Sequence, residues 1–289
     1  MEPGTYVGFD YTLLDGGVAV LTFNSPERLN GLTQVIKREL AEAVLQLEFD
    51  QAVRVIVFTG TGRAFCAGDD ITGRTYAPAN ARRLMPDLPA GGPAIERISS
   101  LKFRSAQLNW MVANISKPTI AAINGVAIQS GLSLALSCDF RLASTDARLG
   151  SATLRFGYQP DEGGHFLLVR LIGLARATEF LMRNRIVPAD DALALGLVNE
   201  VVAPEQLQDR TLDLARELAS GPQVAMRLLK RSLQNATSMS MEQAMEDIAV
   251  RTAVSDYHPD AHEGRASFVE RRSPRFNAWL EGSEPGPGA

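Results

Sequence analysis

A strand-and-helix pattern that occurs twice most constrains how this 289-residue chain can fold. Residues 11–23 alternate around the turn "DGG", as two short strands of a hairpin do. A segment with helical apolar spacing follows, "LTQVIKRELAEAVLQLEFD", and then the β-branched run "VRVIVFTG". The order returns with "KPTIAAINGVA" as a strand, "SGLSLALSCD" as a helix, "FRLAS" as a strand and "GGHFLLVRLIGLARATEFLM" as helix. This repetition predicts a stacked α/β fold.

The pattern also predicts how the chain is divided. Residues 1–205 contain the strands and are expected to form an α/β core, whereas residues 206–280 are almost wholly helical in pattern. The final segment, residues 281–289, reads "EGSEPGPGA" and has the composition of a disordered tail. Between Arg74 and Ala94 the sequence is irregular and rich in glycine and proline, which is typical of a long functional loop.

Composition excludes several classes of protein. No apolar run approaches the ~20 residues that a membrane span needs, and the N-terminus lacks a secretory pattern, so we expect a cytoplasmic protein that does not enter a membrane. A net charge of −4 argues against nucleic-acid binding. Two distant cysteines, Cys66 and Cys138, and three histidines suggest no metal site, and both cysteines are expected to be buried thiols.

Two segments share a design that suits an anion-binding site. Both "VIVFTGTGRAFCAGDDI" and "TIAAINGVAIQSGLSLAL" lead from a buried strand through glycine-rich turns toward a helix. Backbone N–H groups at the start of a helix have no intrahelical partner, so two such turns that meet could hold a developing negative charge. The alternative is that these glycines only allow tight turns.

The motifs, taken in order, resemble those of the crotonase superfamily, also called the enoyl-CoA hydratase/isomerase family. They are "NSPERLNGL", "RAFCAGDDI", "KPTIAAINGVA", "CDFRLAS", "GYQPDEGG", "RIVPADDALALGLVNEVV" and "FVERRSPRF". The resemblance implies a spiral of ββα units with a C-terminal helical region that forms trimers, or hexamers made of two trimers. It also implies an acyl-CoA thioester as substrate, with no cofactor beyond the CoA moiety itself.

The resemblance assigns an oxyanion hole to two backbone N–H groups, those of Asp69 and Ser130. Many relatives have three glycines where this chain has Gln129-Ser130-Gly131. Here the backbone must therefore take a conformation that residues with a Cβ can also adopt.

The acid and base residues of the family's hydratases are replaced in this chain. Their two glutamates fall on Ser133 and Thr153, and a hydroxyl is a weak base at neutral pH, so simple hydration is disfavoured. Several isomerases of the family use a lone aspartate at the position of Asp161, which makes Asp161 the expected base and Glu162 the second candidate. Both acids could instead merely precede a helix, where acids are favoured. Nearby Tyr158 and His165 are expected to have packing roles.

The resemblance also implies CoA-binding residues, although each arginine could equally be an exposed surface charge. The expected phosphate-binding residues are Arg28, Arg271 and Arg272, the last two acting across a subunit boundary. The residues expected to line the adenine and pantetheine pocket are Ala64, Ala67, Asp70 and Ile71. Double-bond isomerisation is the predicted reaction. The alternatives are a hydratase with unusual acid and base groups, a hydrolase, decarboxylase or C–C lyase, and an acyl-CoA-binding protein without activity.

Overall fold

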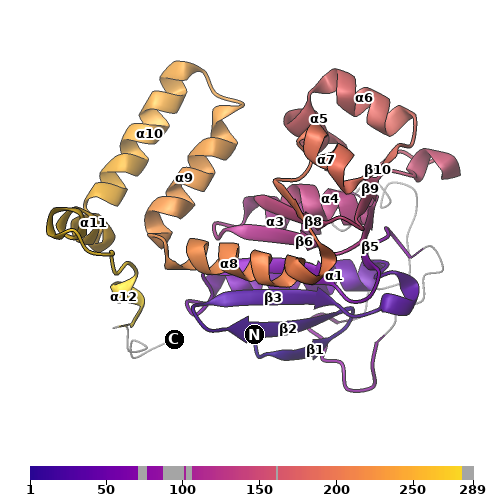
Figure 1. The fold of residues 1–289 in the computed structure, drawn as a ribbon, viewed down its shortest axis with the longest axis horizontal. Helices are drawn as coiled ribbons and strands as arrows, with labels where there is room; N and C mark the ends of the chain where they lie inside the picture. The colour runs from indigo at the N-terminus through magenta and orange to yellow at the C-terminus, as the bar shows by residue number, and fades with distance from the viewer. Residues whose placement is uncertain (71–76, 87–100, 102–105, 161, 282–289) are drawn as a thin grey trace.

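The computed structural model describes residues 1–70, 77–86, 101, 106–160 and 162–281 (Figure 1). In this part of the chain, seven strands form one mixed sheet in the order β1-β2-β3-β4-β6-β8-β11, and four form a second in the order β10-β9-β7-β5. The strands are β1 (Gly4–Tyr6), β2 (Phe9–Leu14), β3 (Val18–Phe23), β4 (Val55–Gly60), β5 (Ala64–Cys66), β6 (Thr119–Ile123), β7 (Val126–Ile128), β8 (Phe140–Ser144), β9 (Arg148–Gly150), β10 (Ile186–Pro188) and β11 (Glu200–Val202). The predicted α/β crotonase-like fold is confirmed.

Helices follow the strands and cover the sheets. They are α1 (Gln34–Phe49), α3 (Gln107–Asn114), α4 (Ser130–Ser137), α5 (Gly164–Ile172), α6 (Leu174–Met182), α7 (Ala189–Leu195), α8 (Leu207–Ser220), α9 (Gln223–Ala236), α10 (Met241–Asp256), α11 (Pro259–Glu270) and α12 (Ala278–Glu281). The hairpin predicted over residues 11–23 is β2 and β3, which pair antiparallel from Phe9 with Phe23 to Leu14 with Val18. The single helix expected after Gly163 is two helices, because the chain turns at Gly173, where φ is +79°.

The repeating unit differs from the prediction in one respect. The segment "KPTIAAINGVA" was expected to be one strand, but it forms β6 in the large sheet and β7 in the small one. The break lies at Asn124-Gly125, where a Cβ on Gly125 would stand 2.1 Å from the carbonyl oxygen of Arg63. Strands β4 and β5, and likewise β8 and β9, are divided between the sheets in the same way. Each of these three strand pairs therefore places one strand in each sheet, whereas β2 and β3, which precede α1, both lie in the large sheet.

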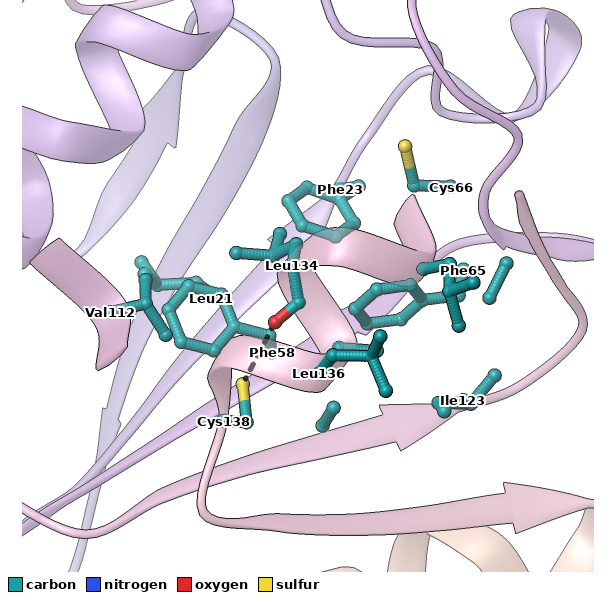
Figure 2. Packing of buried hydrophobic residues seen from close by; sticks show 14 of the residues in the cluster. Leu21, Phe23, Phe58, Phe65, Cys66, Val112, Ile123, Leu134, Leu136 and Cys138 are labelled. Atoms are coloured by element: carbon teal, nitrogen blue, oxygen red, sulfur yellow. Dashed lines mark hydrogen bonds between the residues drawn. The ribbon is translucent and has the colours of Figure 1, made fainter. Parts of the chain in front are cut away.

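The core fills both faces of the large sheet. On one face, α1 is capped by Thr33, whose hydroxyl accepts from the Ile36 N–H, and it buries Ile36, Leu40 and Leu47. Helix α4 is buried at every position, and Figure 2 shows its Leu134 and Leu136 among aromatic side chains of the strands, Phe23, Phe58 and Phe65. On the other face, α8 packs against the sheet through a second apolar cluster, which includes Val18, Val55, Ile120, Leu207, Ala215 and Ala219.

The C-terminal helices α9 to α11 extend away from the two sheets (Figure 1). This agrees with the helical pattern predicted after residue 206, and the division into two units at that point stays a prediction. The predicted tail falls on Glu281, the last residue of α12, and on residues 282–289, which lie outside the described residues. Of the irregular segment 74–94, residues 77–86 are described and contain only an isolated bridge between Arg82 and Tyr6. No helix in the described residues is both long and apolar enough to cross a membrane.

Candidate active site

The two glycine-rich turns meet, as the sequence predicts. A Cβ built on Gly131, in the first turn of α4, would lie 2.0 Å from the carbonyl oxygen of Cys66 at the end of β5. A Cβ on Gly68 would lie 3.4 Å from the carbonyl oxygen of Ile128, and Gly68 has a φ of +112°. Glycine is required at Gly131 because the backbone of the other turn leaves no room for a Cβ, and at Gly68 because residues with a side chain rarely adopt its φ. Asp69, which follows Gly68, and Ser130, which precedes Gly131, are thereby brought together.

The backbone around Asp69 turns its own N–H group away from Leu32. In the isolated parallel bridge between these residues, Leu32 N–H donates to Gly68 O at 2.9 Å and Asp70 N–H donates to Leu32 O at 3.0 Å. Successive peptide groups of an extended segment point in opposite directions, so the N–H of Asp69 faces the other side. Ser130 is the first residue of α4, where a backbone N–H has no intrahelical acceptor. Both orientations suit the predicted oxyanion hole, which stays a prediction.

Gln129 stands where many relatives have glycine, and its backbone retains the glycine-like conformation. Its φ is +50° and its ψ is −107°, a combination that residues with a Cβ rarely adopt. Its side chain is fixed at both ends: Oε1 accepts from the hydroxyls of Ser151 at 3.0 Å and Thr153 at 2.9 Å, and Nε2 donates to Glu162. Thr153, which the resemblance puts at a hydratase glutamate position, therefore orients the Gln129 amide toward the carboxylate of Glu162.

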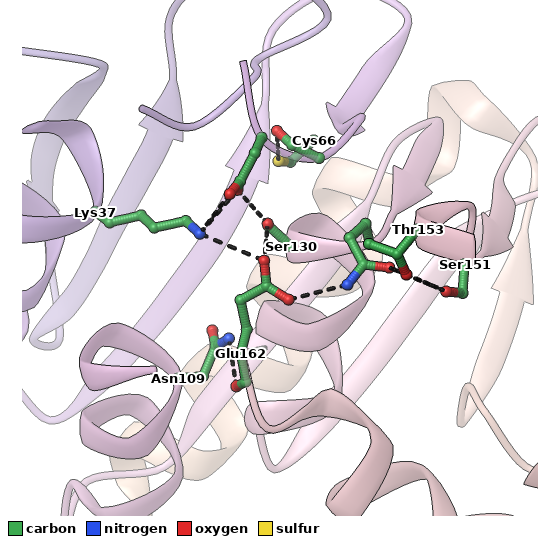
Figure 3. A network of polar contacts seen from close by, with 10 residues as sticks. Lys37, Cys66, Asn109, Ser130, Ser151, Thr153 and Glu162 are labelled. Atoms are coloured by element: carbon green, nitrogen blue, oxygen red, sulfur yellow. Dashed lines mark hydrogen bonds and ion pairs between the residues drawn. The ribbon is translucent and has the colours of Figure 1, made fainter. Parts of the chain in front are cut away.

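Glu162 is the buried carboxylate of this site, with 2% of its surface exposed (Figure 3). Its Oε1 accepts from the Ser130 hydroxyl at 2.6 Å and lies 3.4 Å from Lys37 Nζ, while its Oε2 accepts from Gln129 Nε2 at 3.0 Å. Its backbone carbonyl accepts from the Asn109 amide of α3 at 3.0 Å. A carboxylate has about four acceptor positions, so these three contacts occupy most of them and fix the orientation of the group.

Lys37 is a site residue that our sequence reasoning missed. It lies in the first turn of α1, is 2% exposed, and its Nζ stands 2.8 Å from Asp69 Oδ1. A signal was present in the sequence, because Lys37 is three residues before Leu40 and seven before Val44, which puts it on the buried face of the helix. A lysine on such a face needs a buried anionic partner. Asp69 and Glu162 supply the two partners.

The surroundings of Glu162 hold it in the ionised form. Burial by itself raises the pKa of this carboxyl, but the ammonium of Lys37 and hydrogen bonds from Ser130 and Gln129 outweigh burial and hold the pKa below its usual range. A carboxylate ionised at neutral pH can accept a proton from a substrate. Because a low pKa weakens a base, the site must also stabilise the product of proton removal.

Comparisons with known proteins agree with this geometry. The model of the enoyl-CoA hydratase/isomerase family matches residues 14–278. The chain belongs to this family. A 1,2-epoxyphenylacetyl-CoA isomerase from Escherichia coli K12 is 35% identical over 269 residues, covering 91% of this chain and 96% of that protein. A 4-chlorobenzoyl coenzyme A dehalogenase from an Arthrobacter species is 33% identical, covering 87% of each chain. A crystal structure of an enoyl-CoA hydratase from Bacillus anthracis has a TM-score of 0.83 at 28% identity, covering 93% of this chain and 98% of that one.

In this crotonase-family acyl-CoA enzyme the residues expected to bind CoA differ in their burial and in their contacts. Arg28 Nη1 and Asp70 Oδ2 lie 2.5 Å apart. Ala67, three residues before Asp70, is half-buried. Ala64 has no exposed surface, and its carbonyl accepts from Asn30, so its burial argues against a lining role. Ile71 lies outside the described residues.

Arg271 and Arg272 directly follow α11, and within one chain α11 lies far from α4, the helix that begins at Ser130 (Figure 1). Arg271 is exposed and ends α11 with a φ of +53°. The guanidinium of Arg272 is bound by the carboxylates of Glu263 and Glu270, each at 2.5 Å. A phosphate at Arg272 would have to compete with these two acids.

The remaining sequence candidates have mixed outcomes. Asp161 lies outside the described residues, so its role as the base stays a prediction. The packing roles expected for Tyr158 and His165 are wrong, because both side chains are exposed.

Cys66 and Cys138 are buried free thiols as predicted, and burial raises the pKa of each to about 12. Among the residues described, no group of three or more histidine, cysteine, aspartate or glutamate side chains is arranged to hold a metal ion.

Proposed function

We propose that this crotonase-family enzyme isomerises the double bond of an enoyl-CoA thioester, with Glu162 as the group that moves the proton. One observation carries the proposal: Glu162 is a buried carboxylate whose Oε1 accepts from Ser130, the first residue of α4. The family resemblance implies in addition that hydroxyl residues, Ser133 and Thr153, stand in for the two hydratase glutamates. The similarity to a 1,2-epoxyphenylacetyl-CoA isomerase from E. coli over most of both chains supports an isomerisation of a CoA ester, although that relative is named for an epoxide substrate.

The proposed chemistry uses the two turns together. The backbone N–H groups of Asp69 and Ser130 would bind the thioester oxygen and stabilise the enolate formed when a proton leaves the alpha carbon. Glu162 would take this proton and return it two carbons away, at the gamma carbon. A single carboxylate suffices for both transfers, because the proton that it removes is the one that it returns.

Lys37 limits the charge that the site must hold. Without it, two carboxylates and an enolate would lie together, and like charges in a poorly solvated site repel strongly. The buried pair of Lys37 and Glu162 also argues against an inactive acyl-CoA-binding protein. Burying an acid and a base together is costly, and a groove that only binds acyl-CoA does not need such a pair.

The direct test is incubation with 2-enoyl-, 3-enoyl- and dienoyl-CoA thioesters, with products identified by mass and double-bond position. Isomerisation leaves the mass unchanged, whereas hydration adds the mass of water. We expect Glu162→Gln to lower turnover by ~10²–10⁴-fold while CoA-ester binding is retained, because the amide keeps the shape and cannot accept the proton. A water adduct as the main product would favour the alternative, a hydratase.

Asp161→Asn is the matched variant, since the two acids are neighbours in one segment. If Asp161→Asn removes turnover and Glu162→Gln does not, Asp161 is the base, as the family resemblance implies. If neither substitution slows the reaction, the proton is moved by another group and the proposed mechanism is wrong.

The CoA moiety is proposed to bind near Arg28 and, from a neighbouring subunit, near Arg271 and Arg272. Because a remote phosphate does not change during the reaction, replacing Arg271 and Arg272 by alanine should raise KM and leave kcat nearly unchanged. A fall in kcat alone would remove these arginines from the phosphate site.

A homotrimer or a hexamer is proposed from the apolar side chains on the C-terminal helices. Met241, Met245, Ile248 and Phe268 are all exposed in the single chain. Apolar groups gathered in this way are typical of a subunit interface. Light scattering at micromolar concentration should show a trimer or twice its mass, and a monomer would contradict the proposal.

A further inference from the structure

The hydroxyl of Ser130 lies between two carboxylates. It is 2.6 Å from Glu162 Oε1 and is also within hydrogen-bond distance of Asp69 Oδ1. A hydroxyl has one proton to donate and can accept another. Ser130 can therefore donate to either carboxylate, and once one of them is protonated, Ser130 can accept from that carboxyl group while it donates to the other.

The two carboxylates differ in their access to water. Glu162 is 2% exposed, whereas the side chain of Asp69 is 37% exposed. Lys37 contacts both carboxylates, and the Ser130 hydroxyl is within hydrogen-bond distance of each. The side chains of Glu162, Ser130 and Asp69 therefore connect a buried proton acceptor to the solvent.

The second oxygen of Glu162 offers no comparable route among the described residues. Its partner is the amide of Gln129, which donates a hydrogen bond but does not exchange protons readily. The hydroxyls of Ser151 and Thr153 donate to the other end of the same amide and do not reach Glu162. The described contacts therefore favour the Ser130 side for proton exchange.

We propose that the Ser130 hydroxyl and the Asp69 carboxylate carry protons between Glu162 and the solvent, in addition to the backbone role expected of both residues. This inference rests on the proposed function, in which Glu162 accepts the alpha proton. Once Glu162 is protonated, its O–H donates the proton to Ser130 Oγ, and the Ser130 hydroxyl proton moves to Asp69 Oδ1. Asp69 then releases a proton to water, so that Glu162 and Asp69 are again carboxylates and Ser130 is again a hydroxyl.

The relay creates a competition during each turnover. The proton on Glu162 either returns to the gamma carbon of the enolate or leaves through Ser130 and is replaced by one from water. The first outcome keeps the original hydrogen in the product, and the second exchanges it. The ratio of the two outcomes reports the relay itself, whereas damage to the oxyanion hole would slow both outcomes together.

The experiment uses a 3-enoyl-CoA deuterated at the alpha carbon, in ordinary water, and measures deuterium at the gamma carbon of the product. Wild type should lose a measurable share of the label to water. Ser130→Ala keeps the backbone N–H and removes the hydroxyl, and Asp69→Asn keeps the N–H and removes the exposed carboxylate. Both variants should lose most of the exchange and retain the label, even where their turnover also falls.

Ser137→Ala is the matched control, because it removes another buried hydroxyl from α4, one whose donor contact is to the Ser133 carbonyl. It should exchange as wild type does. The relay is refuted if wild type retains all of the label, or if Ser130→Ala and Asp69→Asn exchange as much as wild type. If Ser130→Ala does not fold, Asp69→Asn decides, since it changes an exposed side chain. If wild type isomerises no thioester of the panel, the proposed function fails first and the relay falls with it.

Discussion

A buried lysine lies at each end of helix α1, and the two lysines differ in the groups that they contact there. Lys37 belongs to the first turn of α1 and contacts the carboxylates of Asp69 and Glu162. Lys117, which immediately precedes β6 in the motif "KPTIAAI", is 1% exposed and donates to the carbonyls of Leu47 and Asp50 at the C-terminal end of the same helix.

The helix dipole explains the contrast. Cations are favoured at the C-terminus of a helix, where carbonyls have no intrahelical partner, and disfavoured at its N-terminus. Lys117 follows this rule and is held by backbone alone, as expected of a lysine that fixes a helix to a sheet. Lys37 opposes the rule and is held by two acids. A buried charge that opposes local preference is a better indicator of a functional site than one that agrees with it.

Of the two lysines, Lys37 should have the larger effect on turnover when it is replaced. In Lys37→Met only the hydrogen bonds from Ser130 and Gln129 still offset the burial of Glu162, so its pKa rises and two carboxylates face the enolate without a cation. We expect kcat/KM to fall by roughly 10²-fold, within the range of general-base effects. Steady-state kinetics on the 3-enoyl-CoA that wild type converts would measure it. Unchanged kcat/KM would show that Lys37 is a structural lysine like Lys117.

Replacing Lys117 should mainly lower stability. Lys117→Met leaves the carbonyls of Leu47 and Asp50 without this donor, and an unsatisfied buried polar group costs roughly 1–3 kcal/mol. Urea unfolding should show this loss in the free energy of unfolding, while kcat/KM stays within about twofold of wild type. A Lys117→Met protein that is fully stable but inactive would reverse the assignment of the two lysines.

The pH dependence of stability should separate the lysines further. The pKa of Glu162 is lowered in the folded state, so ionised Glu162 contributes stability above its unfolded pKa, and this contribution is lost as pH falls through the folded value. Burial, with repulsion from Arg227, lowers the pKa of Lys117 to about 8. Between this value and an unfolded pKa of ~10.4, the unfolded state binds more protons, so the contribution of Lys117 to stability rises with pH.

Thermal unfolding across pH can isolate each contribution as a difference between variant and wild type. In Lys37→Met the difference should be large at neutral pH and shrink as the pH falls through the raised pKa of Glu162 in the folded variant toward its lowered pKa in folded wild type. In Lys117→Met it should grow from pH 8 toward pH 10. The same pH profile for both variants would mean that neither lysine acts through its charge.

The order of the strands and helices was predictable from the sequence, because apolar periodicity and glycine positions are local signals. The division of "KPTIAAINGVA" between two sheets was not, since it depends on Asn124, whose amide binds the carbonyls of Gly62 and Ala64 in a distant turn. The meeting of the two turns was predictable from their shared design. The place of Glu162 opposite Lys37 was not, because 125 residues separate them and only the fold brings their side chains together.

Family resemblance located the turns but did not show what replaces the hydratase glutamates. Thr153 was identified from the sequence only as a residue that cannot act as a strong base. In the structure its hydroxyl orients Gln129, which in turn donates to Glu162. Side-chain networks of this kind have no fixed spacing in sequence, so a motif cannot reveal them.

The start of α4 extends the comparison to the backbone, and the smallest predicted effect lies there. Helix α1 begins at Thr33 with an ordinary extended cap, whereas α4 begins at Gln129 with a φ of +50°. Gln129→Gly should relieve roughly 1–3 kcal/mol of backbone strain, but it also loses the hydrogen bond to ionised Glu162, worth a similar amount. The free energy of unfolding should therefore change by less than about 1 kcal/mol.

Gln129→Leu separates these two contributions, because it removes the amide and keeps the Cβ in the same strained backbone. We expect Gln129→Leu to unfold more readily than Gln129→Gly in urea, with the difference equal to the strain that glycine relieves. Both variants remove one donor from Glu162, so its pKa should rise and the acid limb of the turnover profile should move to higher pH in each. A Gln129→Gly enzyme that is more stable than wild type with an unchanged acid limb would show that the strained glutamine contributes nothing to Glu162, and the start of α4 would then be no more specialised than the start of α1.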